Sequence, residues 1–232
     1  LRGLVGSEMC IRDRKESLLV NQKLVELSPE DSNAHNNLAN SLKGVGRLNE
    51  AESSYKKSIS LDQNNALAHI NLAKTLFDLH KYVEAEEHYK KAISLKYNDF
   101  EAHSNFGNML GSQGRLVKAK ECYETSIKIN PTYARGHRLY SLMKHFETKD
   151  EQYLRMQDIY LDQDISDNQR CEICFALGKA SEDLQDYKQA FKFLSEGNRL
   201  RKKVLNYDSG EDVELFREIK SSFPKIEMSK LE

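Results

Sequence analysis

The sequence predicts an all-α solenoid, in which pairs of helices repeat along the chain. Three consecutive blocks of 34 residues, 32–65, 66–99 and 100–133, align without a gap. Small residues recur at places eight and twenty of each block, and a tyrosine recurs at place twenty-four. The apolar residues of each block follow a helical period in two runs, at about places 2–14 and 17–30. Each block is therefore expected to form a helix–turn–helix unit that stacks on its neighbours.

The composition agrees with this class and excludes several others. The 232 residues carry 35 Lys+Arg and 36 Asp+Glu, which gives a formal net charge of -1, and they include three prolines. Few prolines suit continuous helices. The balanced charge provides no basic field for nucleic acid, and no apolar run reaches the roughly 18 residues of a membrane span. We therefore expect no nucleic-acid partner and no membrane span.

The cysteines Cys10, Cys122, Cys171 and Cys174 are too few for a disulfide framework in a chain of this length. They favour a reducing compartment, and we expect a cytoplasmic location. Cys171 and Cys174 form a CxxC pair, but zinc would need two further ligands and a redox motif would need a βαβ unit. The two thiols are interpreted as packing residues, and no metal or cofactor is predicted for this chain.

The repeat register predicts how the chain is divided. Residues 1–14 lack the repeat pattern, and their VGSEMCIRDR part resembles a translated sequencing adaptor from assembled metagenomic reads; a short native or disordered tail is the alternative. The predicted array covers 15–147, as a half repeat 15–31, full repeats 32–65, 66–99 and 100–133, and the start of a fourth, 134–147.

The pattern diverges at 148–204 and returns to register at 171–204. Ala119 and Ala190 lie 71 residues apart, which places a three-residue insertion in the fourth copy. A helix is predicted at Asp150–Leu161, and Ser166 with Gln169 predicts a capping box. Residues 205–232 are expected to form a capping helix, starting at Ser209, and a linker to a downstream domain that this sequence does not contain.

A histidine recurs at place four, as His35, His69, His103 and His137. Equivalent places on successive repeats lie about 10 Å apart, as packed helix layers do. That spacing is too wide for two ligands of one zinc ion. Packing between repeats is therefore the expected role, with metal binding as the alternative.

A row of polar side chains is predicted on the first helices. Place six is asparagine in all three repeats, and place nine, almost one turn further along the same face, carries Asn, Lys and Asn. A carboxamide both donates and accepts hydrogen bonds, so such a row can pair with the backbone of an extended peptide. Hydrogen bonds between neighbouring repeats are the alternative role for the asparagines. The predicted peptide-binding residues are Asn37, Asn40, Asn71, Lys74, Asn105 and Asn108.

Residues 15–133 resemble a tetratricopeptide array, through segments such as NNLANSLKGVGRLNEAESSY and HSNFGNMLGSQGRLVKAKECY. The resemblance implies a right-handed superhelix whose first helices line a concave groove for a protein or peptide. The place-six asparagines resemble the asparagine ladder of O-linked N-acetylglucosamine transferase arms. This likeness covers Asn37, Asn71 and Asn105, whereas Leu139 departs from it.

The segment FALGKASEDLQDYKQAFKFLSEGNRLRKK, Phe175–Lys203, resembles the region that joins repeats to catalysis in tetratricopeptide-repeat sulfotransferases. Such a parent would bind 3′-phosphoadenylyl sulfate in a domain that this sequence lacks. The sequence shows no nucleophile elbow, phosphate loop or HExxH motif, so no catalytic residue is predicted. The chain is expected to be the substrate-recruiting N-terminal part of such an enzyme; the alternatives are a stand-alone scaffold and a glycosyltransferase arm.

Overall fold

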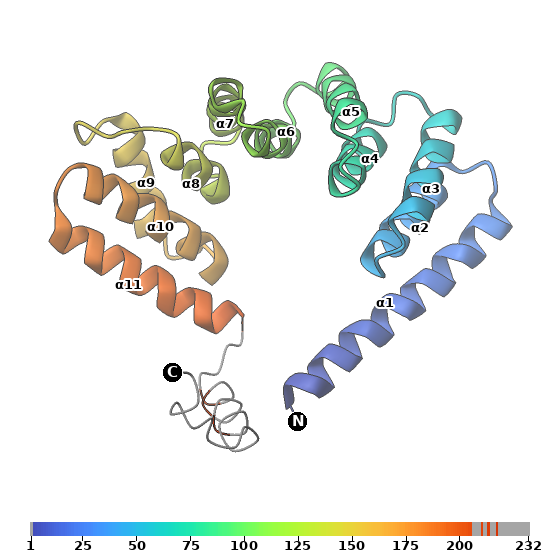
Figure 1. Ribbon diagram of the computed structural model, residues 1–232, viewed down its shortest axis with the longest axis horizontal. Coiled ribbons are helices and arrows are strands. Elements are labelled where there is room, and N and C mark those ends of the chain that lie inside the picture. The colour runs from blue at the N-terminus through green and yellow to red at the C-terminus, as the bar shows by residue number, and fades with distance from the viewer. Residues whose placement is uncertain (1, 206–209, 211–212, 214–216, 218–232) are drawn as a thin grey trace, which may run out of the picture. The chain divides into compact units, whose positions relative to one another are not determined.

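The computed structural model describes residues 2–205 together with 210, 213 and 217, and side chains from Asp13 onward. The described residues form 11 α-helices and contain no β-strand (Figure 1), which confirms the predicted all-α class. The chain divides into two compact units, Leu1–Gly136 and His137–Glu232, here called unit 1 and unit 2.

Unit 1 contains three helix pairs, one in each predicted repeat. Each first helix packs on its own second helix, and each second helix packs on the first helix of the next repeat. Adjacent first helices also contact one another, which places them on the inner side of the curve of unit 1 (Figure 1). The pairs are α2 (Ser32–Gly44) with α3 (Leu48–Leu61), α4 (Ala66–Asp78) with α5 (Tyr82–Leu95), and α6 (Phe100–Ser112) with α7 (Leu116–Ile129).

The helix α1 (Arg2–Leu27) precedes these pairs and packs on α2. It contains the predicted second helix of the half repeat, but it begins at Arg2. Residues 2–14 lie within the bounds of this helix. The stretch from Ser7 to Arg14 contains no glycine or proline, so nothing in it stops a helix that has already formed in residues 15–27.

The two helices of a repeat cross where their side chains are smallest. Ala51, Ala85 and Ala119, all at place twenty, are completely buried. A side chain at Gly107 would put its Cβ 2.7 Å from Cε1 of Tyr123, so this crossing has no room for even a methyl group. The predicted small residues are therefore needed for close approach of the helices.

The turn inside each pair holds one residue, at place fifteen, in the left-handed backbone region. Gly46 and Gly114 have φ of 83° and 73°, and His80 and Gln185 have φ of 60° and 58°. Glycine adopts this conformation without steric cost, whereas His80 and Gln185 carry the Cβ that disfavours it. The same turn geometry is therefore kept where the sequence no longer supplies glycine.

The recurring histidines tie each first helix to the end of the preceding repeat. Nε2 of His69 lies 3.3 Å from the carbonyl oxygen of Gln63, and Nε2 of His103 lies 2.9 Å from that of Tyr97. His35 makes the same contact with the carbonyl six residues before it, at 2.8 Å. Because a carbonyl only accepts, Nε2 is the protonated nitrogen in each ring. The side chains that the structure describes include no group of three or more His, Cys, Asp or Glu that could hold a metal.

Ion pairs connect the second helices of adjacent repeats. The carboxylate of Glu52 accepts from Nζ of Lys81 in the next repeat at 2.8 Å and from Nζ of Lys56 at 2.6 Å. Glu86, its equivalent in the second repeat, is held in the same way by Arg115 of the next repeat. We call these two contacts, Glu52–Lys81 and Glu86–Arg115, the inter-repeat ion pairs.

Unit 2 is built around one long pair of helices. The helix α10 (Asp167–Asp183) packs along α11 (Tyr187–Val204), α9 (Glu151–Leu161) packs on α10, and α8 (Ala134–Leu142) spans the boundary between the units. Ser166 and Gln169 form the predicted capping box. Most of the predicted capping helix from Ser209 lies outside the described residues.

The loop after α8 is held by one carboxylate of α10. Asp183 accepts from the backbone N–H of Phe146 at 3.0 Å and pairs with Lys179 and with His145. Lys144 in turn pairs with Asp150, which caps α9. These contacts attach the segment 143–150 to α10 and to the start of α9.

The two cysteines of the CxxC pair are buried where α10 meets α11. The Cys171 thiol donates to the carbonyl oxygen of Gly197 at 3.4 Å, and burial raises the pKa of Cys174 to about 12. Both thiols are therefore protonated packing groups at neutral pH.

Candidate functional site

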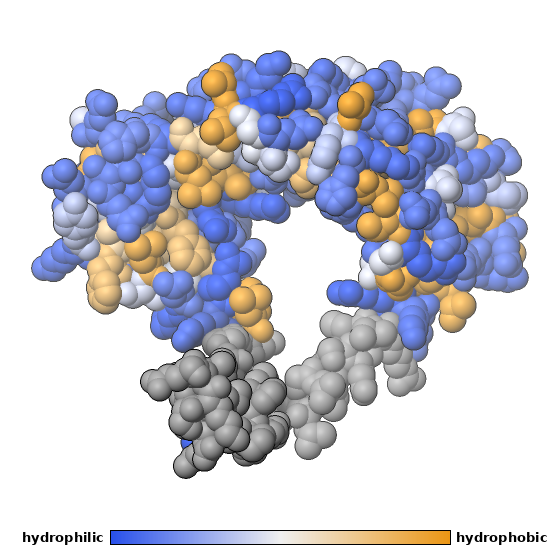
Figure 2. All heavy atoms as spheres, in the orientation of Figure 1, coloured by the Kyte–Doolittle hydropathy of each residue, from blue (hydrophilic) through white to orange (hydrophobic). Residues whose placement is uncertain are grey.

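All six predicted peptide-binding residues lie on the first helices of unit 1, two each on α2, α4 and α6. Asn37 and Asn40 are exposed, and the four equivalents in the second and third repeats are half-buried. We call the side chains at places six and nine of these helices the inner face. Figure 2 shows separate hydrophobic patches among hydrophilic residues on the viewed side of unit 1.

The place-six asparagines do not share one environment. Nδ2 of Asn71 donates to Oδ1 of Asn36 in the preceding repeat at 3.3 Å, and Asn36 is buried. Asn71 is thus engaged in a contact between repeats, the alternative role considered for it. Asn37 and Asn105 have no hydrogen-bond partner among the described residues. Asn36, at place five, was not identified from the sequence because place five is not asparagine in the other two repeats.

The tyrosines at place twenty-four of the first and third repeats orient the asparagines at place nine. Oη of Tyr55 donates to Oδ1 of Asn40 at 2.6 Å, and Oη of Tyr123 donates to Oδ1 of Asn108 at 3.0 Å. Each carbonyl oxygen therefore already has a partner, and the two N–H groups of each amide remain available. A spacing of fifteen residues between Asn and Tyr, present in both repeats, was the sequence signal for this contact.

Lys74 occupies place nine in the second repeat. It is half-buried and makes no hydrogen bond or ion pair with any described residue. Burial is the main cause that lowers the pKa of Lys74, and the positive charges of Lys43 and Arg135 add to it, whereas Glu101 and Asp99 oppose it. An ammonium group that is partly removed from water without a bonded partner favours an incoming carboxylate.

Place nine therefore presents donors in all three repeats: an amide, an ammonium group and a second amide. Neither a nucleophile with a neighbouring base nor a metal-binding group accompanies them among the described residues. The chemistry that this row supports is the recognition of acceptor groups, namely carbonyl oxygens and carboxylates.

Comparison with known proteins agrees with this architecture. Residues 30–98 and 100–133 match two sequence models, both described as tetratricopeptide repeat. None of the curated proteins compared with the chain matches it. Within the described residues, no helix is both long and apolar enough to cross a membrane.

Several solved structures share the fold at low sequence identity. The crystal structure of MamA is 20% identical, with a TM-score of 0.51, over 84% of this chain and 92% of that one. YrrB, described as a TPR protein with an unusual peptide-binding site, is 19% identical, with a TM-score of 0.55, over 78% and 91%. Cut9 in the APC/C hetero-tetramer Cut9–Hcn1 is 18% identical, with a TM-score of 0.62, but the match covers 81% of this chain and 37% of that one. Residues 30–98 and 100–133 are therefore matched as tetratricopeptide repeats, and the paired helices share the fold of these solved structures.

Proposed function

We propose that unit 1 binds an extended, acidic polypeptide segment on its inner face. The observation that carries this proposal is Lys74, a half-buried ammonium group without a bonded partner in the described part of the chain. It lies between two repeats whose place-nine amides accept a tyrosine hydroxyl through Oδ1 and keep both N–H groups free. The ligand that satisfies this row has a carboxylate near its middle and backbone carbonyls on either side.

The spacing of the row suits an extended chain. Place nine recurs once per repeat, about every 10 Å, as expected for stacked helix layers. An extended peptide advances about 3.3 Å per residue. One inner-face donor therefore meets every third peptide residue, so that Asn40 and Asn108 address carbonyls on both sides of the residue that pairs with Lys74.

The expected affinity is modest and is dominated by the charged contact. A hydrogen bond to a charged group contributes about 1.5–3 kcal/mol, against about 0.5–1.5 kcal/mol for a neutral one. Binding should therefore depend more on Lys74 than on either amide.

The described cysteines are all free thiols: Cys171 and Cys174 are buried, and Cys122 is half-buried. Free thiols agree with a partner that is met in a reducing compartment such as the cytoplasm.

The test compares two lysine variants of equal charge change. Lys74→Met removes the inner-face ammonium group, and Lys118→Met removes an exposed cation of α7. We expect Lys74→Met to weaken binding of an acidic nonapeptide about tenfold or more, measured by titration calorimetry, with little effect of Lys118→Met. Equal losses in the two variants would show that only net charge matters and would reject the site.

A second experiment separates the two roles of the asparagines. Asn40→Ala with Asn108→Ala should weaken peptide binding; because each change also removes the acceptor of a buried tyrosine hydroxyl, circular dichroism is used to show that the helices stay folded. Asn71→Ala should instead lower the melting temperature, because it leaves the buried Oδ1 of Asn36 without its donor. If the Asn40/Asn108 double variant binds peptide as well as the unchanged chain does, the donor row is not the binding site.

A recruiting role within a sulfotransferase-like parent is the finer proposal, and the resemblance of Phe175–Lys203 supports it. Under this proposal the 232-residue chain by itself has no sulfotransferase activity, because its sequence lacks a nucleotide loop. Sequencing the reading frame beyond Glu232 tests the proposal. A strand followed by a glycine-rich, Ser/Thr-bearing loop would support the enzyme, whereas a stop codon or further repeats would favour the scaffold.

A further inference from the structure

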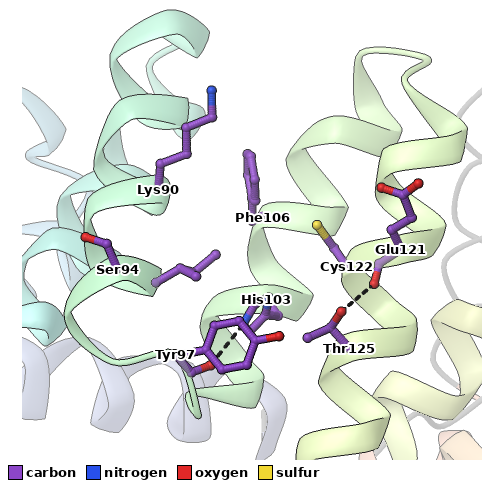
Figure 3. A pocket seen from close by; sticks show the side chains of 9 residues that line it. Lys90, Ser94, Tyr97, His103, Phe106, Glu121, Cys122 and Thr125 are labelled. Carbon is purple, nitrogen blue, oxygen red and sulfur yellow. Dashed lines mark hydrogen bonds between the residues drawn. The ribbon is translucent and has the colours of Figure 1, made fainter.

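A cavity of about 530 Å³ lies between α5, α6 and α7 of unit 1 (Figure 3). Its walls are largely apolar: Ile93 and Tyr97 come from α5 and the residues after it, Phe106 comes from α6, and Cys122 comes from α7. His103 of α6 also lines it. The volume lies in the range of small-ligand sites, and none of the inner-face residues lines it.

The preceding repeat shows what fills the corresponding space. Place twenty-three is Cys122 in the third repeat and His88 in the second. The ring of His88 lies against that of His69, with Nδ1 atoms 2.9 Å apart and ring centroids 5.1 Å apart. Because Nε2 of His69 donates to the Gln63 carbonyl, its Nδ1 is the acceptor, and His88 supplies the N–H.

The third repeat keeps the acceptor and lacks the donor. Nε2 of His103 is bound to the carbonyl oxygen of Tyr97 at 2.9 Å, which leaves a lone pair on Nδ1. No described residue forms a hydrogen bond with this Nδ1. Burial lowers the pKa of His103, so its ring stays neutral and able to accept. The shorter side chain of Cys122 leaves open the space that an imidazole occupies one repeat earlier.

The surrounding rings suit an aromatic guest. The ring of Tyr97 meets that of His103 edge-on, at a centroid distance of 5.3 Å and an angle of 79°. Phe106 adds a second aromatic wall. At the rim, Lys90 is already paired with Glu86 at 2.8 Å, and the exposed Glu121 carries the opposite charge. A neutral aromatic side chain therefore fits this site better than a charged one.

We propose that the cavity is a docking site for one aromatic N–H side chain, histidine or tryptophan, of a protein partner. The ring enters between Phe106 and Tyr97, takes the place that His88 has in the second repeat, and donates its N–H to Nδ1 of His103.

The first test measures three capped tripeptides, Gly-His-Gly, Gly-Trp-Gly and Gly-Phe-Gly, by NMR titration of the whole chain. The first two can donate an N–H and the third cannot. We expect the His and Trp peptides to bind about 2- to 12-fold more tightly than the Phe peptide, with shifts at His103 and Phe106. Equal affinities, or shifts confined to the inner face, would overturn the proposal.

Two reciprocal variants provide the matched control. Cys122→His should rebuild the ring pair of the second repeat, fill the cavity and abolish binding; Cys122→Leu serves the same purpose if the first variant does not fold. His88→Cys should open a second site beside His69 and raise the stoichiometry from one peptide to two. Unchanged binding in a folded cavity-filling variant would refute the assignment. Lys74→Met should leave this binding unaffected, so failure here and failure of the inner-face proposal are distinguishable.

Discussion

His69 and His88 face each other across the two helices of the second repeat, joined by a hydrogen bond of 2.9 Å between their Nδ1 atoms. Burial lowers the pKa of both rings. The neighbouring cations reinforce this effect: Lys91 lowers the pKa of His69, and Lys56 lowers that of His88, which Glu84 opposes. The pair is thus held neutral in the folded protein, while each histidine of the unfolded chain takes up a proton near its ordinary pKa of 6.5.

The first prediction follows from this difference in proton uptake. Because the folded pKa values lie below the unfolded ones, the stabilisation is complete above about pH 6.5 and is lost as the pH falls through the folded values. The melting temperature should therefore drop between about pH 7 and pH 5, and His88→Ser should reduce that slope. An unchanged slope in His88→Ser would contradict this account.

The second prediction concerns the inter-repeat ion pair of Glu86. Hydrogen bonds from Arg115 and Lys90 hold the pKa of Glu86 at about 2, below its ordinary value of 4.5. Its contribution is present above pH 4.5 and is lost as the pH falls toward 2. Glu86→Gln should lower the free energy of unfolding by about 1 kcal/mol at neutral pH, measured by urea denaturation. Glu87→Gln, at the exposed neighbour, should change it by less than about 0.5 kcal/mol.

The third prediction uses the left-handed turns. Gln185→Gly relieves a Cβ at φ of 58° and should raise the free energy of unfolding by about 1 kcal/mol. Gly114→Ala places a Cβ at φ of 73° and should lower it by a similar amount. Chemical denaturation measures both. Changes of the same sign in the two variants would show that the backbone conformation does not decide stability here.

The fourth prediction tests the repeat register. Ala85 is completely buried where α4 crosses α5, so Ala85→Leu should cost about 1–3 kcal/mol or more through overpacking. Ala66, the first residue of the same repeat, is only half-buried, and Ala66→Leu should be much milder. Thermal melts of the two variants provide the comparison, and equal losses would indicate that the register is misplaced.

Much of the fold of unit 1 could be predicted because every repeat restates the same constraints. Small residues at the Ala85 and Gly107 places mark the helix crossings, and Asp99 marks a helix start by capping the N–H of Ala102. A segment that occurs once in the chain has no equivalent to be compared with, so periodicity does not predict its contacts. The attachment of segment 143–150 by Asp183 depends on a single carboxylate 37 residues from Phe146, which no repeat comparison can reveal.

The inner face was predictable in its position but not in its hydrogen bonding. The register predicts Asn71 and Asn108 on first helices, but it does not specify which side chain each of them meets. The structure distinguishes them, because Asn71 bonds to Asn36 and Asn108 bonds to Tyr123. These partners depend on side-chain reach across helices, which spacing within one helix does not specify. The cavity beside Cys122 cannot be predicted for a related reason, since it depends on how far a side chain at place twenty-three reaches, and among the three repeats that place is histidine in the second alone.

The inter-repeat ion pairs also determine how the array unfolds. In a stack where each repeat touches only its neighbours, cooperativity comes from the interface terms rather than from the stability of single repeats. Glu52–Lys81 and Glu86–Arg115 are such terms, and both are partly exposed to screening by salt. Raising the ionic strength should therefore broaden the unfolding transition and allow repeats to melt separately, so that salt changes the sharpness of unfolding as well as its midpoint.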